Sequence, residues 1–342
     1  MNYNGKLILL AYPDTFVKTT QEFLCKLLPL VGLGTRHYIK AGHAALILIE
    51  NETGKARYFD FGRYITPKGF GRLRGSNTDA ELKIPFNAKI SSEEKLENLN
   101  DFLLWLDQNP RKTHGSGRLL ASLCDSVDFK KAEAYIFGLQ DRGSIPYGAF
   151  NRNGSNCARF VTETLLASTD NEKIRKKLRK NKTFTPSTVG NVEVSASNGK
   201  IYEIFEGSIS LYQSSALKEN LVNYFDKNSK THPEVENKKL KILQQSDSQK
   251  LTGIGCDAWF QLMPTTLPQN HFRIKRYDIY GNMDFDGVYK EPSGKFNFKR
   301  SFRFTYDSHC NYCHIIQDGT KFKFDIVATF ATFNLRQKEH SA

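Results

Sequence analysis

The sequence predicts an α+β protein of two domains, the first built on an antiparallel sheet and the second mostly of β structure. Two apolar runs, His43–Glu50 and Ala56–Gly62, are joined by the turn residues NETGK and predict a β-hairpin. Amphipathic runs with helical spacing, such as the one that begins at Cys157, alternate with these strands. After residue 200, charged residues alternate with aromatic or branched ones, which is typical of antiparallel strands with one face in water.

The elements of the first domain follow from local patterns. Before the hairpin, a buried strand at Leu7–Tyr12 and a helix around Phe23–Leu28 precede a glycine-rich loop at Val31–Gly42. After the hairpin, the same patterns predict a strand at Asp79–Phe86 and helices at Glu93–Leu106, at Phe129–Leu139 and from Cys157 onward.

Proline, serine, glycine and asparagine cluster in Phe184–Lys200 and mark a linker. We therefore expect domains at residues 1–195 and 196–342. In the second domain, one helix is expected near Lys218. Strands are expected within His271–Gly281, Phe296–Ser308 and Lys321–Phe333.

The charge of the chain is strongly basic and uneven. Of the net charge of +13, residues 1–200 carry +10, from 30 basic and 20 acidic residues. The richest run, Lys173–Lys182, reads as one solvated helix face, and no nucleic-acid motif accompanies it. We therefore expect no nucleic-acid partner.

The location is predicted from what the chain lacks. The first apolar run is too short for a signal peptide, and no stretch has the length of a membrane span. The 6 cysteines are scattered, which fits reduced thiols. These features predict a cytoplasmic protein.

Cys157 follows two residues, Ser155 and Asn156, that are both good helix N-caps. It is therefore expected in the first turn of a helix, where unpaired backbone N–H groups and the helix dipole favour a thiolate. The alternative is a small buried hydrophobic residue, which is the usual role of a free cysteine.

His43 is expected at the rim of the sheet, because it begins a strand directly after a glycine loop. If Glu50 pairs with Lys55, Ala45 faces Asp60, and His43 and Asp60 become diagonal neighbours on one face. A register shift of one residue would place Phe61 or Arg63 there instead. The alternative for His43 is an exposed ring or one satisfied by unrelated partners.

The stretches AGHAALILIE, YFDFG and SNCARFVTETL resemble the circularly permuted NlpC-type cysteine peptidases of the papain-like superfamily. The last stretch is also similar to the nucleophile motif of the lecithin–retinol acyltransferase relatives. The resemblance covers about the first 190 residues, the length of one domain. It implies a papain-like domain with Cys157 as nucleophile, His43 as general base and Asp60 as the orienting residue.

The implied enzyme is a thiol hydrolase that cleaves an amide bond in a peptide or cell-wall peptide fragment through an acyl-enzyme. The backbone N–H of Cys157, with Asn156 and Tyr147 close by, is expected to stabilise the oxyanion. Tyr147 could instead pack beneath its loop. One alternative is an acyl-lipid hydrolase or acyltransferase that uses the same residues, and another is an inactive binding module.

Two further motifs contain groups that could bind a ligand. The basic residues Lys68, Arg72 and Arg74 follow the hairpin and could hold a substrate carboxylate or phosphate, unless they lie on an exposed loop. The run HCNYCH contains a CxxCH spacing, but a second CxxC is absent, so Cys310 and Cys313 are read as a turn with thiols. No metal or cofactor is expected, and zinc at these cysteines stays open.

Overall fold

The apolar run near the N-terminus forms β1 (Gly5–Tyr12), whose residues are all buried. It lies between β4 (His43–Glu50) and β7 (Leu119–Val127) and pairs antiparallel with both. Because both faces of β1 are covered, its sequence from Leu7 to Tyr12 is continuously apolar rather than alternating. The computed structural model describes residues 3–20, 22–151, 153–183, 185–228, 243 and 247–339.

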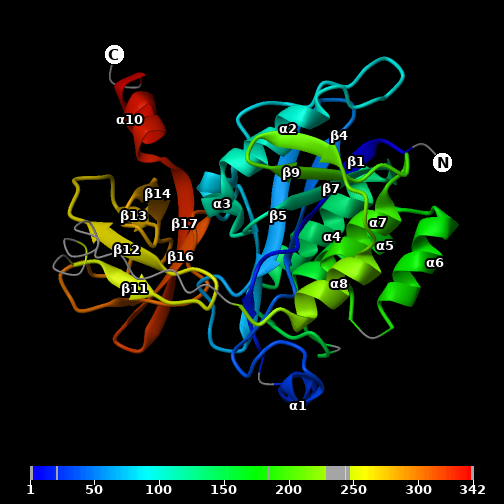
Figure 1. Ribbon diagram of the computed structural model, residues 1–342. Coiled ribbons are helices and arrows are strands. Elements are labelled where there is room, and N and C mark those ends of the chain that lie inside the picture. The colour runs from blue at the N-terminus through cyan, green and yellow to red at the C-terminus, as the bar shows by residue number, and fades with distance from the viewer. Residues whose placement is uncertain are drawn as a thin grey trace. The chain divides into compact units, whose positions relative to one another are not determined.

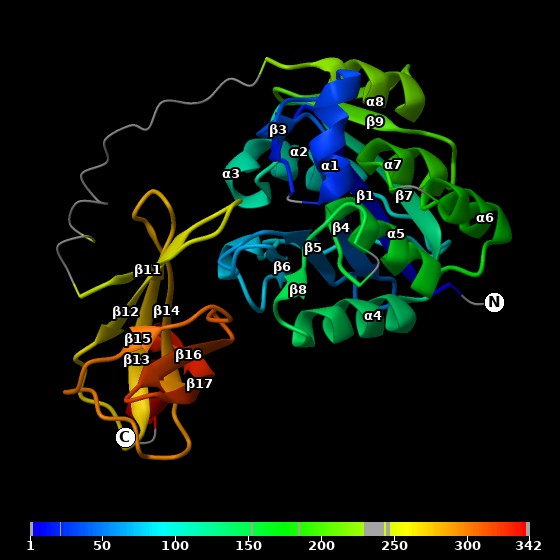
Figure 2. The same ribbon diagram turned by 90° about the horizontal axis from the view of Figure 1, so that it is seen from below.

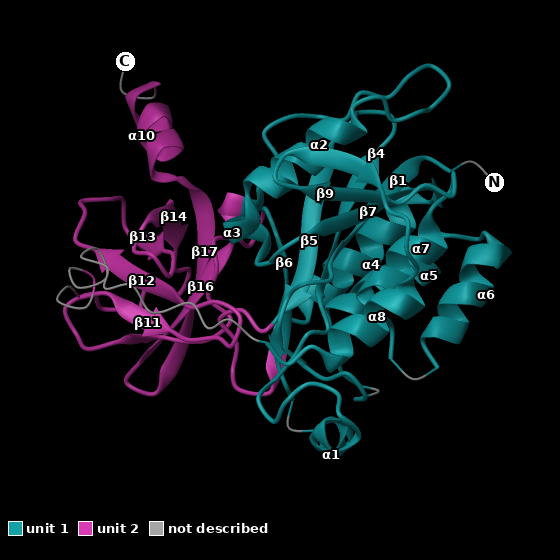
Figure 3. Ribbon diagram, viewed as in Figure 1, with its two compact units in different colours: residues 1–62, 71–76, 82–231 teal, residues 63–70, 77–81, 232–342 magenta. Residues whose placement is uncertain are grey.

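The described residues form two compact units (Figure 3). The first comprises residues 1–62, 71–76 and 82–231, and the second comprises residues 63–70, 77–81 and 232–342. The linker predicted at residues 184–200 instead contains a helix, α7 (Thr188–Ser195), whose buried side chains pack in the first unit.

The first unit contains an eight-stranded sheet in the described part of the chain, with the order β10-β9-β7-β1-β4-β5-β6-β8 (Figures 1 and 2). A separate pair is formed by β2 (Val17–Lys18) and β3 (Tyr38–Ile39). The other strands of the large sheet are β5 (Ala56–Gly62), β6 (Phe70–Gly75), β8 (Ile145–Pro146), β9 (Tyr202–Phe205) and β10 (Ser208–Leu211).

Helices cover both faces of this sheet. Alternate residues of β1 therefore enter two different cores: Leu7 and Leu9 pack with α4, α5 and α7, whereas Ile8 and Leu10 pack with α2. The helices of the first unit are α1 (Phe23–Leu27), η1 (Leu28–Val31), η2 (Ala80–Leu82), α2 (Leu99–Gln108), α3 (Pro110–Thr113), α4 (Phe129–Asp141), α5 (Cys157–Ser168), α6 (Glu172–Asn181), α7 and α8 (Ala216–Phe225).

The structure confirms most of the elements expected in the first domain, but not all of them. The strand at Leu7–Tyr12, the hairpin and the helices at Phe129 and Cys157 are confirmed. The strand expected at Asp79–Phe86 is wrong, because this segment forms only the short η2 and irregular backbone. Strand β7 had no counterpart among the predicted elements.

The second unit is mostly β, as the sequence predicts. Within the described residues its sheet has seven strands in the order β11-β12-β13-β14-β17-β16-β15. They are β11 (Gln249–Leu251), β12 (Ala258–Met263), β13 (His271–Tyr277), β14 (Met283–Lys290), β15 (Arg303–Phe304), β16 (Tyr312–Gln317) and β17 (Thr320–Thr329), followed by helix α10 (Phe330–Glu339).

A buried arginine organises part of the second unit. Arg276 of β13 lies 2.9 Å from carboxylate oxygens of Asp79 and Asp284 and 2.5 Å from Glu81. These three carboxylates supply the negative charge that a buried guanidinium requires. Two of them, Asp79 and Glu81, come from the segment that was expected to be a strand.

No helix in the described part of the chain is long and apolar enough to cross a membrane.

Candidate active site

The hairpin β4–β5 places His43 and Asp60 on one face of the sheet. Its register pairs Ala45 with Asp60, as the sequence predicts, and the backbone N–H of Glu50 donates to Lys55. Nε2 of His43 lies 3.4 Å from Oδ2 of Asp60. Both residues are buried, and Asp60 has no exposed surface.

Gly42, directly before His43, is required by the backbone. Its φ of +74° lies in the left-handed region, and an added Cβ would stand 2.9 Å from Oγ1 of Thr188 and 3.0 Å from the carbonyl of Tyr12. A side chain there would be strained and crowded at once. The glycine therefore lets the chain turn into β4 with His43 at its first position.

Asp60 is held by more partners than the sequence analysis assigned to it. Nε and Nη2 of Arg74, on the neighbouring strand β6, donate to the two carboxylate oxygens at 2.9 and 2.6 Å. The hydroxyl of Tyr58 donates to Oδ2 at 3.1 Å. Burial raises the pKa of Asp60, but the charge of Arg74 and the bonds from His43 and Arg74 outweigh burial and hold the pKa well below its usual range.

Asp60 is thus a carboxylate at neutral pH, and a bidentate contact with the guanidinium of Arg74 fixes its two oxygens. Arg74 is only 1% exposed. Arg74 was expected to hold a substrate anion or else to lie on an exposed loop; it lies instead in strand β6, where its guanidinium binds Asp60.

Helix α5 begins at Cys157, as the cap residues predict. The side chain of Asn156 accepts a hydrogen bond from the backbone N–H of Arg159 at 2.8 Å, and its amide donates to the carbonyl of Gly148 at 3.2 Å. Asn156 therefore caps the helix and also ties it to the preceding loop. Cys157 is 7% exposed at the first position of the helix.

The thiol of Cys157 lies within range of the His43 ring and is one of the groups that act on the pKa of this histidine. Burial by itself lowers the pKa of His43, but its bonds with Asp60 and Cys157 and their negative charges outweigh burial and raise the pKa to about 9. His43 is therefore protonated at neutral pH. The structure thus brings the three residues singled out in the sequence into one chain of contacts, Cys157–His43–Asp60.

The loop that leads to Cys157 is clamped from two sides. The carboxylate of Glu22 accepts from the backbone N–H groups of Ala149 and Phe150 at 2.8 and 3.0 Å. Arg159 donates to the carbonyls of Ala149 and Gly154 at 2.7 and 3.1 Å. Burial raises the pKa of Glu22, but these amides and a hydrogen bond from Thr20 lower it below its usual value.

Sequence reasoning missed Glu22, because 127 residues separate it from the amide that it binds and no local pattern connects them. Arg159 was overlooked for another reason. It lies three residues past the cap Asn156, in the first turn of α5, where an arginine is usually solvated.

Three other residues were expected at the site, namely Tyr147, Arg72 and Lys68. Tyr147 stacks on Phe61, with ring centroids 6.1 Å apart and an interplanar angle of 7°. Arg72 is buried in β6, whereas Lys68 is exposed and belongs to the second unit. The basic residues after the hairpin therefore do not form one exposed cluster.

Helix α8 also borders the candidate site. Burial raises the pKa of Tyr224, and the charge of a Cys157 thiolate raises it further. The backbone carbonyl of Tyr224 accepts from the N–H of Gly34, which lies in the loop that precedes His43. This hydrogen bond joins α8 to the loop before His43.

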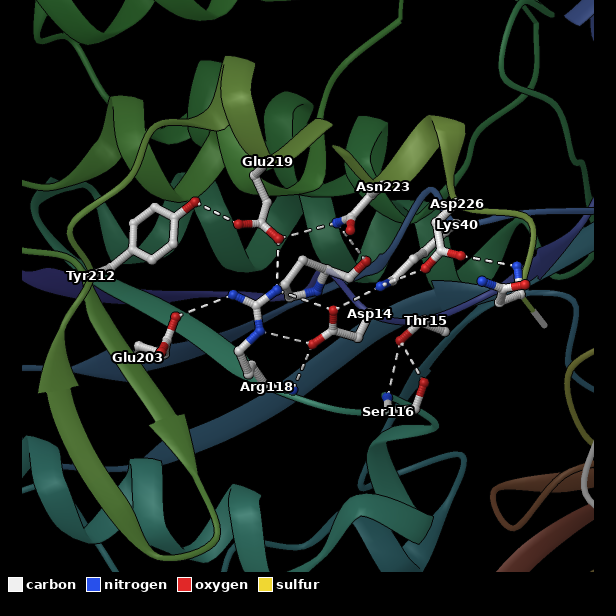
Figure 4. Close-up of polar contacts among 12 residues, drawn as sticks. Asp14, Thr15, Lys40, Ser116, Arg118, Glu203, Tyr212, Glu219, Asn223 and Asp226 are labelled. Carbon is white, nitrogen blue, oxygen red and sulfur yellow. Dashed lines mark hydrogen bonds and ion pairs between the residues drawn. The ribbon is translucent and has the colours of Figure 1, made fainter. Parts of the chain in front are cut away.

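A network of charged side chains fixes α8 against the sheet (Figure 4). Arg118 donates to Asp14 with Nε and Nη2 at 3.0 and 3.1 Å, and to Glu219 of α8 at 2.7 Å. Lys40 lies 3.1 Å from Asp14 and 3.3 Å from Asp226. The turn after β1, the loop before His43 and α8 are therefore bound to one another.

The HCNYCH run lies in the second unit. Burial raises the pKa of Cys313 to about 12 and that of Cys310 further above its usual value. Among the described residues, no group of three or more histidine, cysteine, aspartate or glutamate side chains is arranged to hold a metal ion.

Two family models match parts of this chain. Residues 7–174 match the model described as type VI secretion system effector TseH-like. This segment contains β1, the hairpin and α5, and with them His43, Asp60 and Cys157. Residues 248–327 match the model described as the DUF6695 C-terminal domain, which spans most of the second sheet.

A solved structure, the crystal structure of the type VI secretion system effector TseH, is similar to this chain. The two are 19% identical, with a TM-score of 0.41, and the match covers 62% of this chain and 100% of that one. No curated protein matches. Because the name of the first family describes secreted effectors, the cytoplasmic location stays a prediction.

Proposed function

We propose that this protein is a cysteine hydrolase of the papain-like, NlpC type that cleaves an amide bond in a peptide or a cell-wall peptide fragment. The observation that supports the proposal is the position of His43, whose Nε2 lies 3.4 Å from Asp60 and whose pKa is raised by both Asp60 and Cys157. A nucleophile, a base and an orienting carboxylate in that order are the parts that acyl transfer through a cysteine needs.

In this mechanism the sulfur of Cys157 attacks the amide carbonyl carbon, and the electron pair of the C=O bond moves to the oxygen. The backbone N–H of Cys157, at the start of α5, donates to that oxyanion. As the tetrahedral intermediate collapses, protonated His43 gives its proton to the leaving amine. The products of this half-reaction are the free amine and a thioester on Cys157.

The second half-reaction reverses these roles. Neutral His43 removes a proton from water, the resulting hydroxide attacks the thioester, and the carboxylic acid leaves Cys157. Asp60 keeps the histidine ring in one orientation throughout and stabilises the imidazolium. Arg74 and Tyr58 act through Asp60 and are positioning residues, because their bonds fix its two oxygens.

The substrate class follows from the resemblance to NlpC-type enzymes and from the matching effector family. An enzyme confined to the cytoplasm would meet only cell-wall precursors or recycled fragments. A secreted effector, as the name of the matching family describes, would meet intact cell-wall peptides. The acyl-lipid hydrolase and the inactive binding module remain the competing hypotheses for the same fold.

The first test is the rate of iodoacetamide alkylation at each cysteine, followed by mass spectrometry from about pH 4 to 9. We expect Cys157 to react faster than the buried Cys124, Cys310 and Cys313, and to keep this reactivity under acidic conditions. His43→Ala should remove the advantage, whereas His271→Ala, at a partly buried histidine of the second unit, should leave it unchanged.

A second test asks for turnover. Wild type, but not Cys157→Ala, should release new amino groups from cell-wall peptides, as measured by mass spectrometry of the products. A reactive Cys157 without release from peptides, but with release of fatty acid from phospholipids, would favour the acyl-lipid hydrolase. An unreactive Cys157 that is indifferent to His43→Ala would overturn the hydrolase proposal and favour the binding module.

A further inference from the structure

Two neighbouring segments of the first unit expose large apolar side chains to water. On α8, Leu217 is 72% exposed, and on η1, Leu30 is 79% exposed. We call the whole set the apolar patch. Its members are Phe23, Leu24, Leu27, Leu30 and Val31 of α1 and η1, and Leu217, Leu221, Val222 and Phe225 of α8. Large exposed apolar patches usually mark interaction surfaces, whereas apolar side chains that are exposed singly need no explanation.

The two segments lie against each other. The N–H of Gly34, just after η1, donates to the carbonyl of Tyr224 in α8 at 2.8 Å. A Cβ placed on Gly32 would stand 3.3 Å from the ring of Phe225. The apolar side chains of α8 and η1 therefore belong to one surface.

In the two segments that carry the apolar patch, the fully exposed charged residues are all basic. The exposed charged residues of segments 17–40 and 216–228 are Lys18, Lys26, Arg36, Lys218 and Lys227.

The acidic side chains of these segments bind other groups of the protein. Glu22 binds the backbone of the 149–150 loop, Glu219 binds Arg118, and Asp226 binds Lys40. The surface thus presents aliphatic and aromatic side chains with a basic rim.

We propose that the apolar patch binds the surface of an anionic lipid bilayer. Leucine, valine and phenylalanine would enter the region between headgroups and acyl chains, while the lysines extend to anionic headgroups. Protein–protein interfaces are enriched in aromatic residues, methionine and arginine but depleted of lysine, whereas four of the five exposed charges here are lysines. A second copy of the chain would bring one basic rim against another, which is unfavourable.

Docking in this way would hold the candidate site beside the bilayer. Glu22 links the apolar patch to the loop before Cys157, and Tyr224 of α8 lies near that cysteine. The binding itself does not depend on the proposed hydrolase activity, and it is tested without any substrate.

The test is co-flotation of the full chain with two kinds of vesicle, phosphatidylcholine alone and phosphatidylcholine with about one quarter phosphatidylglycerol. We expect binding to the anionic vesicles at least about tenfold tighter than to the neutral ones, with loss at high salt.

Phe23→Ser/Leu30→Ser should weaken binding to the anionic vesicles by at least about tenfold. The charge-matched control, Val327→Ser/Leu335→Ser, removes two exposed apolar side chains of the second unit and should bind as wild type does.

A second pair of variants separates charge from apolar contact. Lys26→Gln/Lys218→Gln should reduce the preference for anionic vesicles, whereas Lys295→Gln/Lys299→Gln, two exposed lysines of the second unit, should not. Circular dichroism establishes that each variant is folded.

Three results would overturn the proposal. They are no binding to either vesicle, equal binding of Phe23→Ser/Leu30→Ser and wild type, and a dimer in analytical ultracentrifugation that this variant dissolves. The third result would assign the apolar patch to a second copy of the chain.

Discussion

Replacing Arg74 by methionine removes the cation that compensates a fully buried carboxylate. The side chain of Arg74 is 2% exposed and that of Asp60 is 0% exposed, so water cannot take over the role of the guanidinium. Breaking a buried pair by removing one partner costs about 3–5 kcal/mol. Asp60 would keep its contacts with Tyr58 and His43, so we expect Arg74→Met to lower the free energy of unfolding at pH 7 by about 3 kcal/mol.

The penalty should depend on pH in a defined direction. In the wild type, the pKa of Asp60 is depressed, so its stabilising contribution is present above the unfolded value and is lost only when the pH falls through the low folded value. In Arg74→Met, burial dominates and raises the pKa of Asp60. The variant then gains stability relative to wild type as the pH falls from about 7 to 5.

Urea unfolding followed by circular dichroism at both pH values measures the penalty and its pH dependence. Lys95→Met is the control, because Lys95 forms an exposed pair with Glu93 in the same unit and should change stability by less than about 0.5 kcal/mol. At pH 7, Asp60→Asn/Arg74→Met should be at least as stable as Arg74→Met alone, since it leaves no uncompensated charge. A penalty below about 1 kcal/mol, or one equal at both pH values, would refute this account of Asp60.

Three further predictions concern the other residues around Cys157. The pKa of His43 is raised to about 9, so the stability that protonated His43 contributes is present below the ordinary histidine pKa near 6.5 and is lost as the pH rises to about 9. In His43→Gln, the free energy of unfolding should therefore fall less over this pH range, by up to about 3 kcal/mol, as measured by urea unfolding. Glu22→Gln weakens the charge-assisted hydrogen bonds from the backbone amides of residues 149 and 150. Hydrogen exchange at these two amides should become about tenfold faster, and an unchanged rate would contradict the role given to Glu22. Asn156→Ala should lower the free energy of unfolding by about 0.5–2 kcal/mol, because the helix cap is lost. Asn156→Asp should restore most of this stability, because aspartate caps a helix as well as asparagine does. If it does not, the hydrogen bond from Asn156 to Gly148 contributes more than the cap.

The core of the candidate site could be read from short stretches of sequence. The register that makes His43 and Asp60 diagonal neighbours depends on a turn of a few residues between two apolar runs. The start of α5 depends on a cap residue and the first turn that follows it. Both features are decided within about one hairpin or one helical turn, which is why local patterns predict them.

Other features depended on how further strands and loops pack. Arg74 follows the hairpin in a run that resembles a basic loop, and only the pairing of β6 with β5 turns its guanidinium to Asp60. The segment at Asp79 alternates like a strand, but Arg276, 197 residues later, takes its carboxylate. In each case a buried charge required a counter-charge whose position depends on how strands and loops pack, and not on a local turn or cap.

The sequence by itself therefore determined the identity and order of the chemical groups: a cysteine at a helix start, a histidine at a strand start and an acid on the next strand. The tertiary structure decided what surrounds them, namely the clamp of Glu22 on the loop before Cys157, the approach of α8 and the exposed apolar patch. The physical reason is distance along the chain. Turns and caps are local hydrogen-bonding events, whereas burial and charge compensation depend on which distant segments pack together.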